Sequence, residues 1–413
     1  MKIFVTDGNL RSTLGVVRSL GRAGFFVGTG NDSAGMIAGS SRYCRERLLY
    51  PSPASDPVGF CRFLRTELRR RGYTHLLATS DMTTQLVASM KSELAPDITA
   101  MNEDAETLAR VQDKGLVLSA AAGTGVGVPR CISVCSRREL LEFAEQAGYP
   151  VVIKPRRSRH YAYGGWSEGS VRYAHNPSEL IDMYESVSRV IPEPLVQERI
   201  QGDGRGVFLL MWQGEVKAAF CHRRLREKPP WGGVSVLSES LAPDTELIDR
   251  SAALLRGLEW SGPAMVEFKM DARDGQPKLM EVNGRFWGSL QLAIDAGIDF
   301  PLLYLRLVLG EDVTPQLHYR AGVQCRWLLG DLDALMTMWS ARAEQKFLCA
   351  PISRAKLLAD FLRFAGKDLH YDVWSLADPM PSCEELRQYA GINLRLLFGR
   401  SRAALNGAKQ WAA

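Results

Sequence analysis

Two carboxylates and an amide stand in the segment "MVEFKMDARDGQPKLMEVNGRFWGSLQLA", residues 265–293. Glu267 and Glu281 each follow a short apolar run, and Asn283 and Arg285 come directly after the second carboxylate. Because alternate residues of a strand share a face, Glu281 and Asn283 point the same way, and Arg285 can follow them. Converging carboxylates repel unless a cation lies between them, and hard oxygen ligands select Mg²⁺ or Mn²⁺. The spacing therefore predicts a metal site at Glu267, Glu281 and Asn283.

The turn sequence "RDG" between the two runs predicts a hairpin that places Glu267 beside Glu281. The alternative is a solvated sheet face on which both acids pair with Lys269, Lys278 or Arg285. Both acids follow apolar residues directly, as buried ligands do, and this favours the metal site.

Phosphate binding would have to use lysines, because the common nucleotide-binding loops are missing. The sequence lacks Gly-x-x-x-x-Gly-Lys-Ser/Thr, and no glycine cluster completes Gly-x-Gly-x-x-Gly. Lys154 ends the apolar run "YPVVIK", where a poorly hydrated cation needs an anionic partner. The alternative is an edge lysine whose ammonium group reaches solvent.

A second basic segment, "HRRLREKPPWGGVSV", spans residues 222–236. Arg223, Arg226 and Lys228 could hold a substrate carboxylate or a transferred phosphoryl group. The alternative is a solvated, charged hairpin end. We favour a further acidic or carboxylated substrate.

The segment "GWSEG", Gly165 to Gly169, matches the Gly-x-Ser-x-Gly pattern of serine hydrolases. That pattern needs a buried strand immediately before it and a helix immediately after it. The flanking sequences "RRSRHYAYG" and "SVRYAH" predict neither. Ser167 as a nucleophile is therefore the least favoured interpretation.

The elements that must position these residues begin with a βαβ pattern. "KIFVTDG" and "FFVGTG" read as strands around the helix "LGVVRSLGRAG", and helix, strand and helix follow in "FCRFLRTELRRRG", "THLLATSD" and "MTTQLVASMKSEL". Asp7 and Asp81 fall at the carboxyl ends of strands, where open α/β sheets bind ligands. The pattern predicts an N-terminal α/β domain.

The middle of the chain predicts an α+β region with hairpin strands, and helical periodicity dominates from about Asp331 onward. Ser136 and Glu139 form a capping-box pattern at the start of "SRRELLEFAEQAG". Residues 156–170 are basic, aromatic and glycine-bearing without regular periodicity, which is typical of a mobile loop over a ligand.

Taken in order, these features resemble the ATP-grasp superfamily, the fold of D-alanine:D-alanine ligases, biotin carboxylase and carbamoyl-phosphate synthetase. The resemblance covers about residues 113–310. It implies an ATP-grasp fold with a Rossmann-like (pre-ATP-grasp) domain and a C-terminal helical extension. The expected bounds are 1–112 for the N-terminal α/β domain, 113–312 for the ATP-grasp domain (lid subdomain about 113–195, sheet subdomain about 196–312) and 313–413 for the mainly helical extension.

The resemblance also assigns ATP contacts to residues of this sequence. Two lysines match the ATP-contacting pair, "PLVQERIQG" matches the adenine-binding hinge, and two glycines fall in the lid over the phosphates. An acidic residue that usually holds the ribose near Gly206 is missing, and a nearby aspartate is its substitute. In chain order the implied nucleotide contacts are Lys114, Lys154, Gly164, Gly165, Gln197, Glu198, Arg199, Ile200 and Asp203.

Chemistry follows from the same resemblance. Glu267, Glu281 and Asn283 match metal ligands, and Arg285 matches an arginine that contacts phosphate and the reaction intermediate; Gly284 stands where proline is common. ATP-grasp ligases use ATP and Mg²⁺ to activate a carboxylate as an acyl phosphate, which an amine or similar nucleophile attacks. The implied activity is carboxylate–amine ligation that releases ADP and phosphate, with Arg285, Arg223 and Arg226 as catalytic candidates. The alternative is a non-catalytic or regulatory ATP-binding module in a biosynthetic complex, but both lysines and all metal ligands are intact.

Composition sets the remaining expectations. The 413 residues, 46% of them hydrophobic, suffice for two or three packed domains, and the net charge of +5 is spread thinly. That balance favours small phosphate-bearing and carboxylate or amine substrates over nucleic acid. Eight cysteines without a CxxC pair, no signal-peptide pattern and no membrane-spanning run predict a cytoplasmic protein with reduced thiols.

The C-terminal segment "SRAKLLADFLRFAGKDLHYDVWSL" is basic, amphipathic and tryptophan-bearing. It is compatible with docking on a membrane surface or on a partner protein, and packing against the core is the commoner explanation. A homo-oligomer is a further open alternative.

Overall fold

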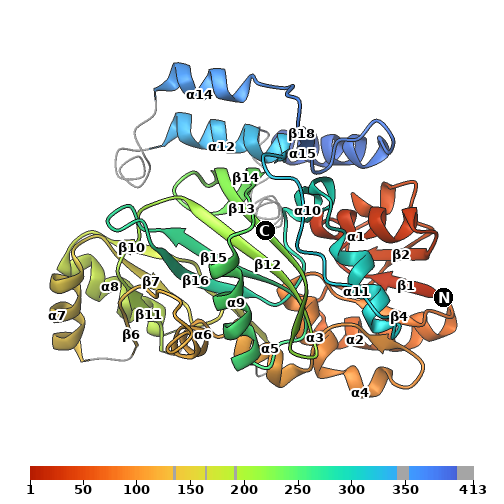
Figure 1. The fold of residues 1–413 in the computed structure, drawn as a ribbon, viewed down its shortest axis with the longest axis horizontal. Helices are drawn as coiled ribbons and strands as arrows, with labels where there is room; N and C mark the ends of the chain where they lie inside the picture. The colour runs from red at the N-terminus through yellow and green to blue at the C-terminus, as the bar shows by residue number, and fades with distance from the viewer. Residues whose placement is uncertain (134–135, 163–164, 190–192, 342–352, 398–413) are drawn as a thin grey trace.

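The structure is a computed structural model, and it describes residues 1–133, 136–162, 165–189, 193–341 and 353–397. Its three larger sheets follow one another across the molecule, with the seven-stranded sheet between the other two (Figure 1). None of the helices in the described ranges is long and apolar enough to cross a membrane.

The N-terminal sheet is parallel and has the strand order β3-β2-β1-β4-β5. Its strands are β1 (Lys2–Val5), β2 (Phe26–Asn31), β3 (Glu46–Leu49), β4 (His75–Leu77) and β5 (Thr99–Ala100). They alternate with α1 (Arg11–Arg22), η1 (Ala38–Ser40), α2 (Pro57–Arg70), α3 (Asp81–Ser89) and α4 (Lys91–Leu94), and α5 (Ala105–Gln112) follows. The order reverses between β1 and β4, so a crevice opens at the carboxyl ends of these two strands.

The second sheet is antiparallel, in the order β10-β7-β11-β6. Its strands are β6 (Cys131–Ser133), β7 (Val151–Lys154), β10 (Arg172–Ala174) and β11 (Leu195–Gln197), and α6 (Lys114–Ala120), α7 (Arg137–Ala147) and α8 (Pro177–Ser188) lie in the same part of the chain. Ser136 and Glu139 form the predicted capping box at the start of α7. Leu140, Ile153 and Leu180 bring these elements together in one apolar cluster.

Residues 156–170 contain regular structure, so the prediction of an irregular loop is wrong for most of them. They form the antiparallel hairpin β8 (Arg159–Ala162) and β9 (Gly165–Glu168). Tyr161 and Trp166 are paired across the strands with ring centroids 5.1 Å apart, and both rings pack against the N-terminal α/β core. An aromatic cross-strand pair stabilises a hairpin through packing that no periodicity test on a short segment detects.

The seven-stranded sheet has the order β16-β15-β12-β13-β14-β17-β18 and is antiparallel except for the last pair. Its strands are β12 (Gly204–Trp212), β13 (Glu215–Lys228), β14 (Val234–Ser240), β15 (Gly262–Met270), β16 (Pro277–Asn283), β17 (Gln324–Arg326) and β18 (Leu369–Tyr371). Alternate residues of β12 enter two different apolar clusters: Phe208 and Leu210 join one, and Val207 and Leu209 join the other. The sheet is therefore buried on both faces, by α1, α10 (Leu290–Ala296) and α11 (Phe300–Val308) on one side and by α9 (Thr245–Gly257) on the other.

The C-terminal part is helical as predicted, and it also adds β17 and β18 to the large sheet. Its described helices are α12 (Leu328–Ser340), α14 (Arg354–Phe361) and α15 (Met380–Leu397). In Figure 1, α12 and α14 lie at the outer edge of the molecule, and α15 packs beside η1 of the N-terminal region.

Candidate active site

The predicted hairpin is confirmed, because Glu267 of β15 lies directly opposite Glu281 of β16. Directly opposed residues of antiparallel strands point to the same face, so the two carboxylates share one face of the sheet. Asn283 lies two residues further along β16, and its amide Nδ2 donates to Glu281 Oε1 at 3.2 Å. The three side chains line a cleft of about 390 Å³ between the second sheet and the large sheet.

Most of the predicted site residues meet in this cleft. Its lining includes Lys114, Lys154, Gln197, Glu198, Arg199, Ile200, Glu267, Glu281, Asn283 and Arg285. They come from α6, β7, the end of β11 and the β15–β16 hairpin, which lie far apart in the sequence. The fold thus brings lysines and carboxylates together in one cleft.

The two lysines differ in their surroundings. Lys114 Nζ lies 3.1 Å from Glu281 Oε2 and donates to Ser158 Oγ at 3.0 Å. Lys154 has lost most of its water, and this burial, only partly offset by Glu281, lowers its pKa to about 8. An ammonium group in such surroundings gains from an anionic ligand, as the sequence predicted.

The facing carboxylates also differ. Burial would raise the pKa of Glu281, but Lys114, Asn283 and Lys154 outweigh it and hold that pKa at about 2. Burial and the like charge of Glu281 raise the pKa of Glu267, although Arg224 forms an ion pair with it. Protein cations therefore balance both acids in this structure.

The side-chain oxygen atoms of Glu267, Glu281 and Asn283 are of the kind that a hard divalent cation binds. Within the described residues no group of three or more His, Cys, Asp or Glu side chains could hold a metal ion. The candidate ligands here are two carboxylates and one neutral side chain, the Asn283 amide, whose Nδ2 donates to Glu281. Mg²⁺ is usually held by one or two carboxylates plus phosphate oxygens and water, which is the set that this hairpin can offer.

At the hinge, the Glu198 carboxylate is held by the protein itself. It accepts from the Arg130 backbone amide at 2.9 Å and forms ion pairs with the guanidinium groups of Arg130 and Arg273. Gln197 is nearly fully buried in β11. The hinge therefore offers a ligand mainly the backbone of Arg199 and Ile200, which line the cleft.

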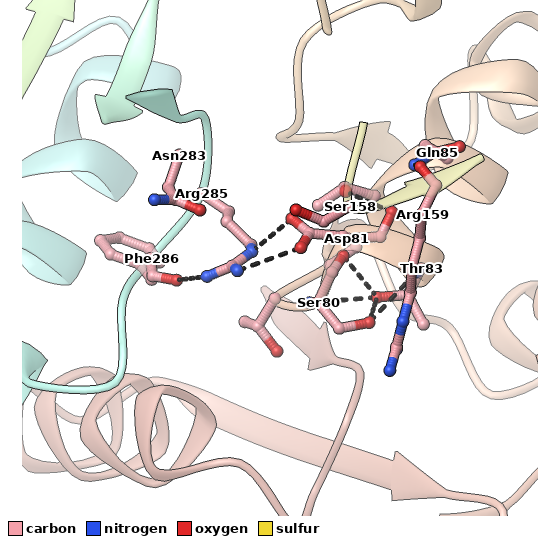
Figure 2. Close-up of polar contacts among 12 residues, drawn as sticks. Ser80, Asp81, Thr83, Gln85, Ser158, Arg159, Asn283, Arg285 and Phe286 are labelled. Carbon is pink, nitrogen blue, oxygen red and sulfur yellow. Dashed lines mark hydrogen bonds and ion pairs between the residues drawn. The ribbon is translucent and has the colours of Figure 1, made fainter. Parts of the chain in front are cut away.

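Arg285 reaches the cleft from the loop after β16, and Asp81 of the N-terminal region holds it in place (Figure 2). Arg285 Nε lies 2.6 Å from Asp81 Oδ1 and Nη2 lies 3.1 Å from Oδ2. Burial opposes the charge on Asp81, but Arg285 outweighs it and the pKa of Asp81 is lowered. The sequence marked Asp81 as a strand-end residue but did not predict this pair, because its members are about 200 positions apart.

The structure does not bring Arg223 and Arg226 to the cleft. Arg223 is exposed and pairs with Glu239. Arg226 makes a two-point contact with the buried carboxylate of Asp331, at 2.6 Å from each oxygen. Instead, β13 turns Arg224 and Lys228 toward the cleft.

Irregular pairing explains this difference on β13. The register against β14 shifts between Arg224 and Arg226 and again between Arg226 and Glu227. A bulge re-aims side chains, so simple alternation fails here. The signal that sequence analysis missed is that Arg224 shares a face with His222, which also lines the cleft.

The remaining predicted residues lie elsewhere. Asp203 is exposed, and its carbonyl accepts from the Met270 amide at 2.9 Å. Gly165 begins β9, whose Trp166 Nε1 donates to the Pro53 carbonyl at 2.8 Å, so the hairpin is docked on the N-terminal region. Gly164 lies outside the described residues. Ser167 lies within β9, which β10 follows, and not the helix that a nucleophile elbow requires.

Comparisons with known sequences show which proteins this chain is similar to. The profile of a family described as ATP-grasp in the biosynthetic pathway with Ter operon matches residues 190–330. The carbamoyl phosphate synthase large chain of Methanobrevibacter smithii is 26% identical over 214 residues, which is 49% of this chain and 19% of that relative. Its counterpart in Thermus thermophilus is 27% identical over 217 residues, which is 50% of this chain and 20% of the relative. The chain thus spans about a fifth of the length of these curated relatives.

Solved structures share the architecture over more of the chain. The biotin carboxylase domain of 2-oxoglutarate carboxylase from Hydrogenobacter thermophilus, in complex with MgADP, ADP and bicarbonate, has a TM-score of 0.62 at 15% identity. The match covers 78% of this chain and 73% of that one. The L-amino acid ligase from Bacillus licheniformis has a TM-score of 0.58 at 18% identity and covers 75% and 74%. The chain therefore has the ATP-grasp fold, and the resemblance to the ATP-grasp superfamily that its motifs predicted is confirmed.

Proposed function

We propose that this protein is an ATP- and Mg²⁺-dependent ligase that activates a carboxylate as an acyl phosphate and couples it to an amine. The observation that carries the proposal is the cleft in which the opposed pair Glu267 and Glu281 faces Lys114 and Lys154. Phosphoryl transfer needs positioning and charge neutralisation on both sides of the phosphates. The two lysines would supply positive charge on one side, and the two carboxylates would hold Mg²⁺ on the other.

The nucleotide would lie along this cleft. Lys114 and Lys154 would bind phosphate oxygens, and the backbone of Arg199 and Ile200 would meet the adenine. Glu267, Glu281 and Asn283 would hold Mg²⁺, which neutralises charge on the phosphates when it is bound. The relative from Hydrogenobacter thermophilus was solved with MgADP, which supports this assignment by analogy of fold.

The reaction balances as two transfers. The substrate carboxylate takes the terminal phosphoryl group of ATP, and ADP leaves. The amine nitrogen then attacks the carbonyl carbon of the acyl phosphate, the bond to the phosphate oxygen breaks, and the amine loses one proton. Arg285 would stabilise the oxyanion of the tetrahedral intermediate, and Asp81 keeps its guanidinium group in place.

The test is a screen for ADP release over pairs of carboxylates and amines with Mg²⁺. The panel combines N-acetyl amino acids as carboxylates with amino acid amides as amines. Glu281→Gln serves as the blank, and Glu239→Gln, the same change on β14 outside the cleft lining, is the matched control. We expect ADP release that needs both substrates, is lost in Glu281→Gln and is kept in Glu239→Gln. Equal signal from Glu281→Gln would exclude the proposed metal site.

A non-catalytic ATP-binding module is the second candidate. It is favoured by one observation: Arg224 and Lys114 already neutralise Glu267 and Glu281 in this structure. ATP binding without ADP release over the whole panel would support that function instead.

A further inference from the structure

A larger cavity of about 570 Å³ adjoins the cleft. Arg11, Arg285 and Gly288 line both spaces. The cavity and the cleft therefore meet at Arg285, which is proposed to stabilise the reaction intermediate. Glycine at 288 leaves room there, because a Cβ would lie 2.8 Å from the guanidinium group of Arg11. A molecule in the larger cavity would therefore lie next to Arg285.

The cavity opens at the crevice where the parallel sheet reverses its strand order. Asp7 follows β1, and Ser80 follows β4 and caps α3. The Asp7 carboxylate is fixed there by the Ser80 backbone amide at 3.1 Å and by the hydroxyl of Ser80 at 3.0 Å (Figure 2 shows Ser80 beside Asp81). Crevices at the carboxyl ends of strands on either side of such a reversal are the usual ligand sites of open α/β sheets.

The opposite wall comes from α15, which belongs to the C-terminal extension. Gln388 Nε2 donates to Asn9 Oδ1 at 3.0 Å, and Ile392 of the same helix lines the cavity. The segment before α15 is anchored by a buried ion pair at 2.9 Å between Arg18 of α1 and Asp378. These contacts hold α15 in place as part of the cavity wall.

Basic and acidic side chains both line the cavity, and most of the basic ones are paired: Arg387, for example, pairs with Glu384. Arg285 is paired with Asp81, and Arg11 is paired with Asp372 and stacked 4.1 Å from the Trp327 ring. By contrast, Asp7 and Asp32 have no Lys or Arg partner in the part of the chain that the structure describes. Their hydrogen bonds come from neutral groups, such as the Asn31 amide 3.2 Å from Asp32. The side of the cavity at Asp7 and Asp32 therefore carries carboxylates without a basic partner among the described residues, and this side suits a cation.

We propose that this cavity binds the amine substrate, a primary amine carried on a body of amino-acid or small-peptide size, and that α15 determines which amine fits. The inference rests on the proposed ligase function. The ammonium group would lie on the side of Asp7 and Asp32, and the body would reach the α15 wall at Ile392. After losing a proton, the nitrogen would attack at Arg285 as described above.

The experiment measures binding of amines to the full chain without ATP, so that it does not depend on turnover. Twenty amino acid amides and their N-acetylated forms are titrated calorimetrically into the wild type, Ile392→Trp, Leu386→Trp and Asp32→Asn. Leu386 is exposed on α15 and does not line the cavity, so Leu386→Trp controls for a tryptophan added to the same helix. Thermal unfolding of each variant checks that it folds.

We expect at least one free amide to bind and its acetylated form to fail. Filling the cavity with Ile392→Trp should weaken that binding by about 10-fold or more. Loss of one half-exposed charge in Asp32→Asn should weaken it by about 3-fold, and Leu386→Trp should bind like the wild type. This result in a protein that releases no ADP would keep the cavity assignment and reject the ligase function.

Three outcomes would overturn the inference. They are no binding of any free amide to the wild type, equal binding of acetylated forms, and equal binding by Ile392→Trp. Each can occur in a protein that still releases ADP, so failure of the cavity assignment is distinct from failure of the proposed function.

Discussion

The β15–β16 hairpin and strand β13 belong to one sheet, yet only the hairpin follows simple alternation at its functional residues. On the hairpin, Glu267 and Glu281 are paired directly and Asn283 continues the same face, because the register shift of this hairpin lies beyond them, between Glu267 and Phe268. On β13, register shifts around Arg226 turn that side chain toward Asp331 of α12. Strand periodicity thus predicts a site where pairing is regular and fails where a bulge and a distant partner intervene.

The largest difference in ATP affinity should appear between a lysine substitution inside the cleft and one outside it. Replacing Lys154 by methionine removes a buried charge from the phosphate side, and ATP affinity should fall by about 100-fold. Lys367→Met, at an exposed position of the C-terminal part, should leave ATP affinity unchanged. Titration calorimetry with a non-hydrolysable ATP analogue measures both. Equal affinities for Lys154→Met and the wild type would remove Lys154 from the site.

The two arginines of β13 should differ in stability. Arg226→Gln leaves the buried Asp331 carboxylate with Arg326 as its remaining ion-pair partner among the described residues, and this should cost about 2 kcal/mol of unfolding free energy. Arg223→Gln removes an exposed pair and should change stability by less than about 0.5 kcal/mol. Chemical denaturation checks both values. If Arg226→Gln were as stable as Arg223→Gln, the ion pair with Asp331 would not hold β13 against α12.

Asp81 should affect turnover more than nucleotide binding. Asp81→Asn keeps hydrogen-bonding groups beside Arg285 but removes the charge that holds it, so we expect kcat/KM to fall by about 10-fold. The affinity for ADP should stay the same, because Asp81 does not line the nucleotide cleft. An equal loss of ADP affinity would show that the pair positions the nucleotide instead.

The smallest effect concerns pH. Lys154 carries its charge below its pKa of about 8 and loses it above, so its attraction for phosphate is present at pH 7 and declines through that value. Between pH 7 and pH 9, ADP affinity should fall by about 3-fold to 10-fold in the wild type beyond any change in Lys154→Met. Parallel pH profiles for the two proteins would exclude this assignment.

Much of the architecture could be predicted from local patterns. The βαβ start, the capping box at Ser136 and the hairpin of Glu267 and Glu281 depend on neighbours in sequence, and periodicity detects such relations. The Arg285–Asp81 pair, the docking of Trp166 on Pro53 and the addition of β17 and β18 to the sheet could not be predicted. They join segments that are far apart in the chain, and no local pattern records which distant partner a charge or an aromatic ring will meet.

The most direct test of the central claim is the Mg²⁺ dependence of ADP binding. Calorimetry would compare ADP affinity in Mg²⁺ and in EDTA for the wild type, Glu281→Gln and the control Glu239→Gln. The cleft described here predicts that Mg²⁺ strengthens ADP binding by about 10-fold or more in the wild type and in Glu239→Gln, and has little effect in Glu281→Gln. The same Mg²⁺ dependence in all three proteins would contradict a metal site on the β15–β16 hairpin.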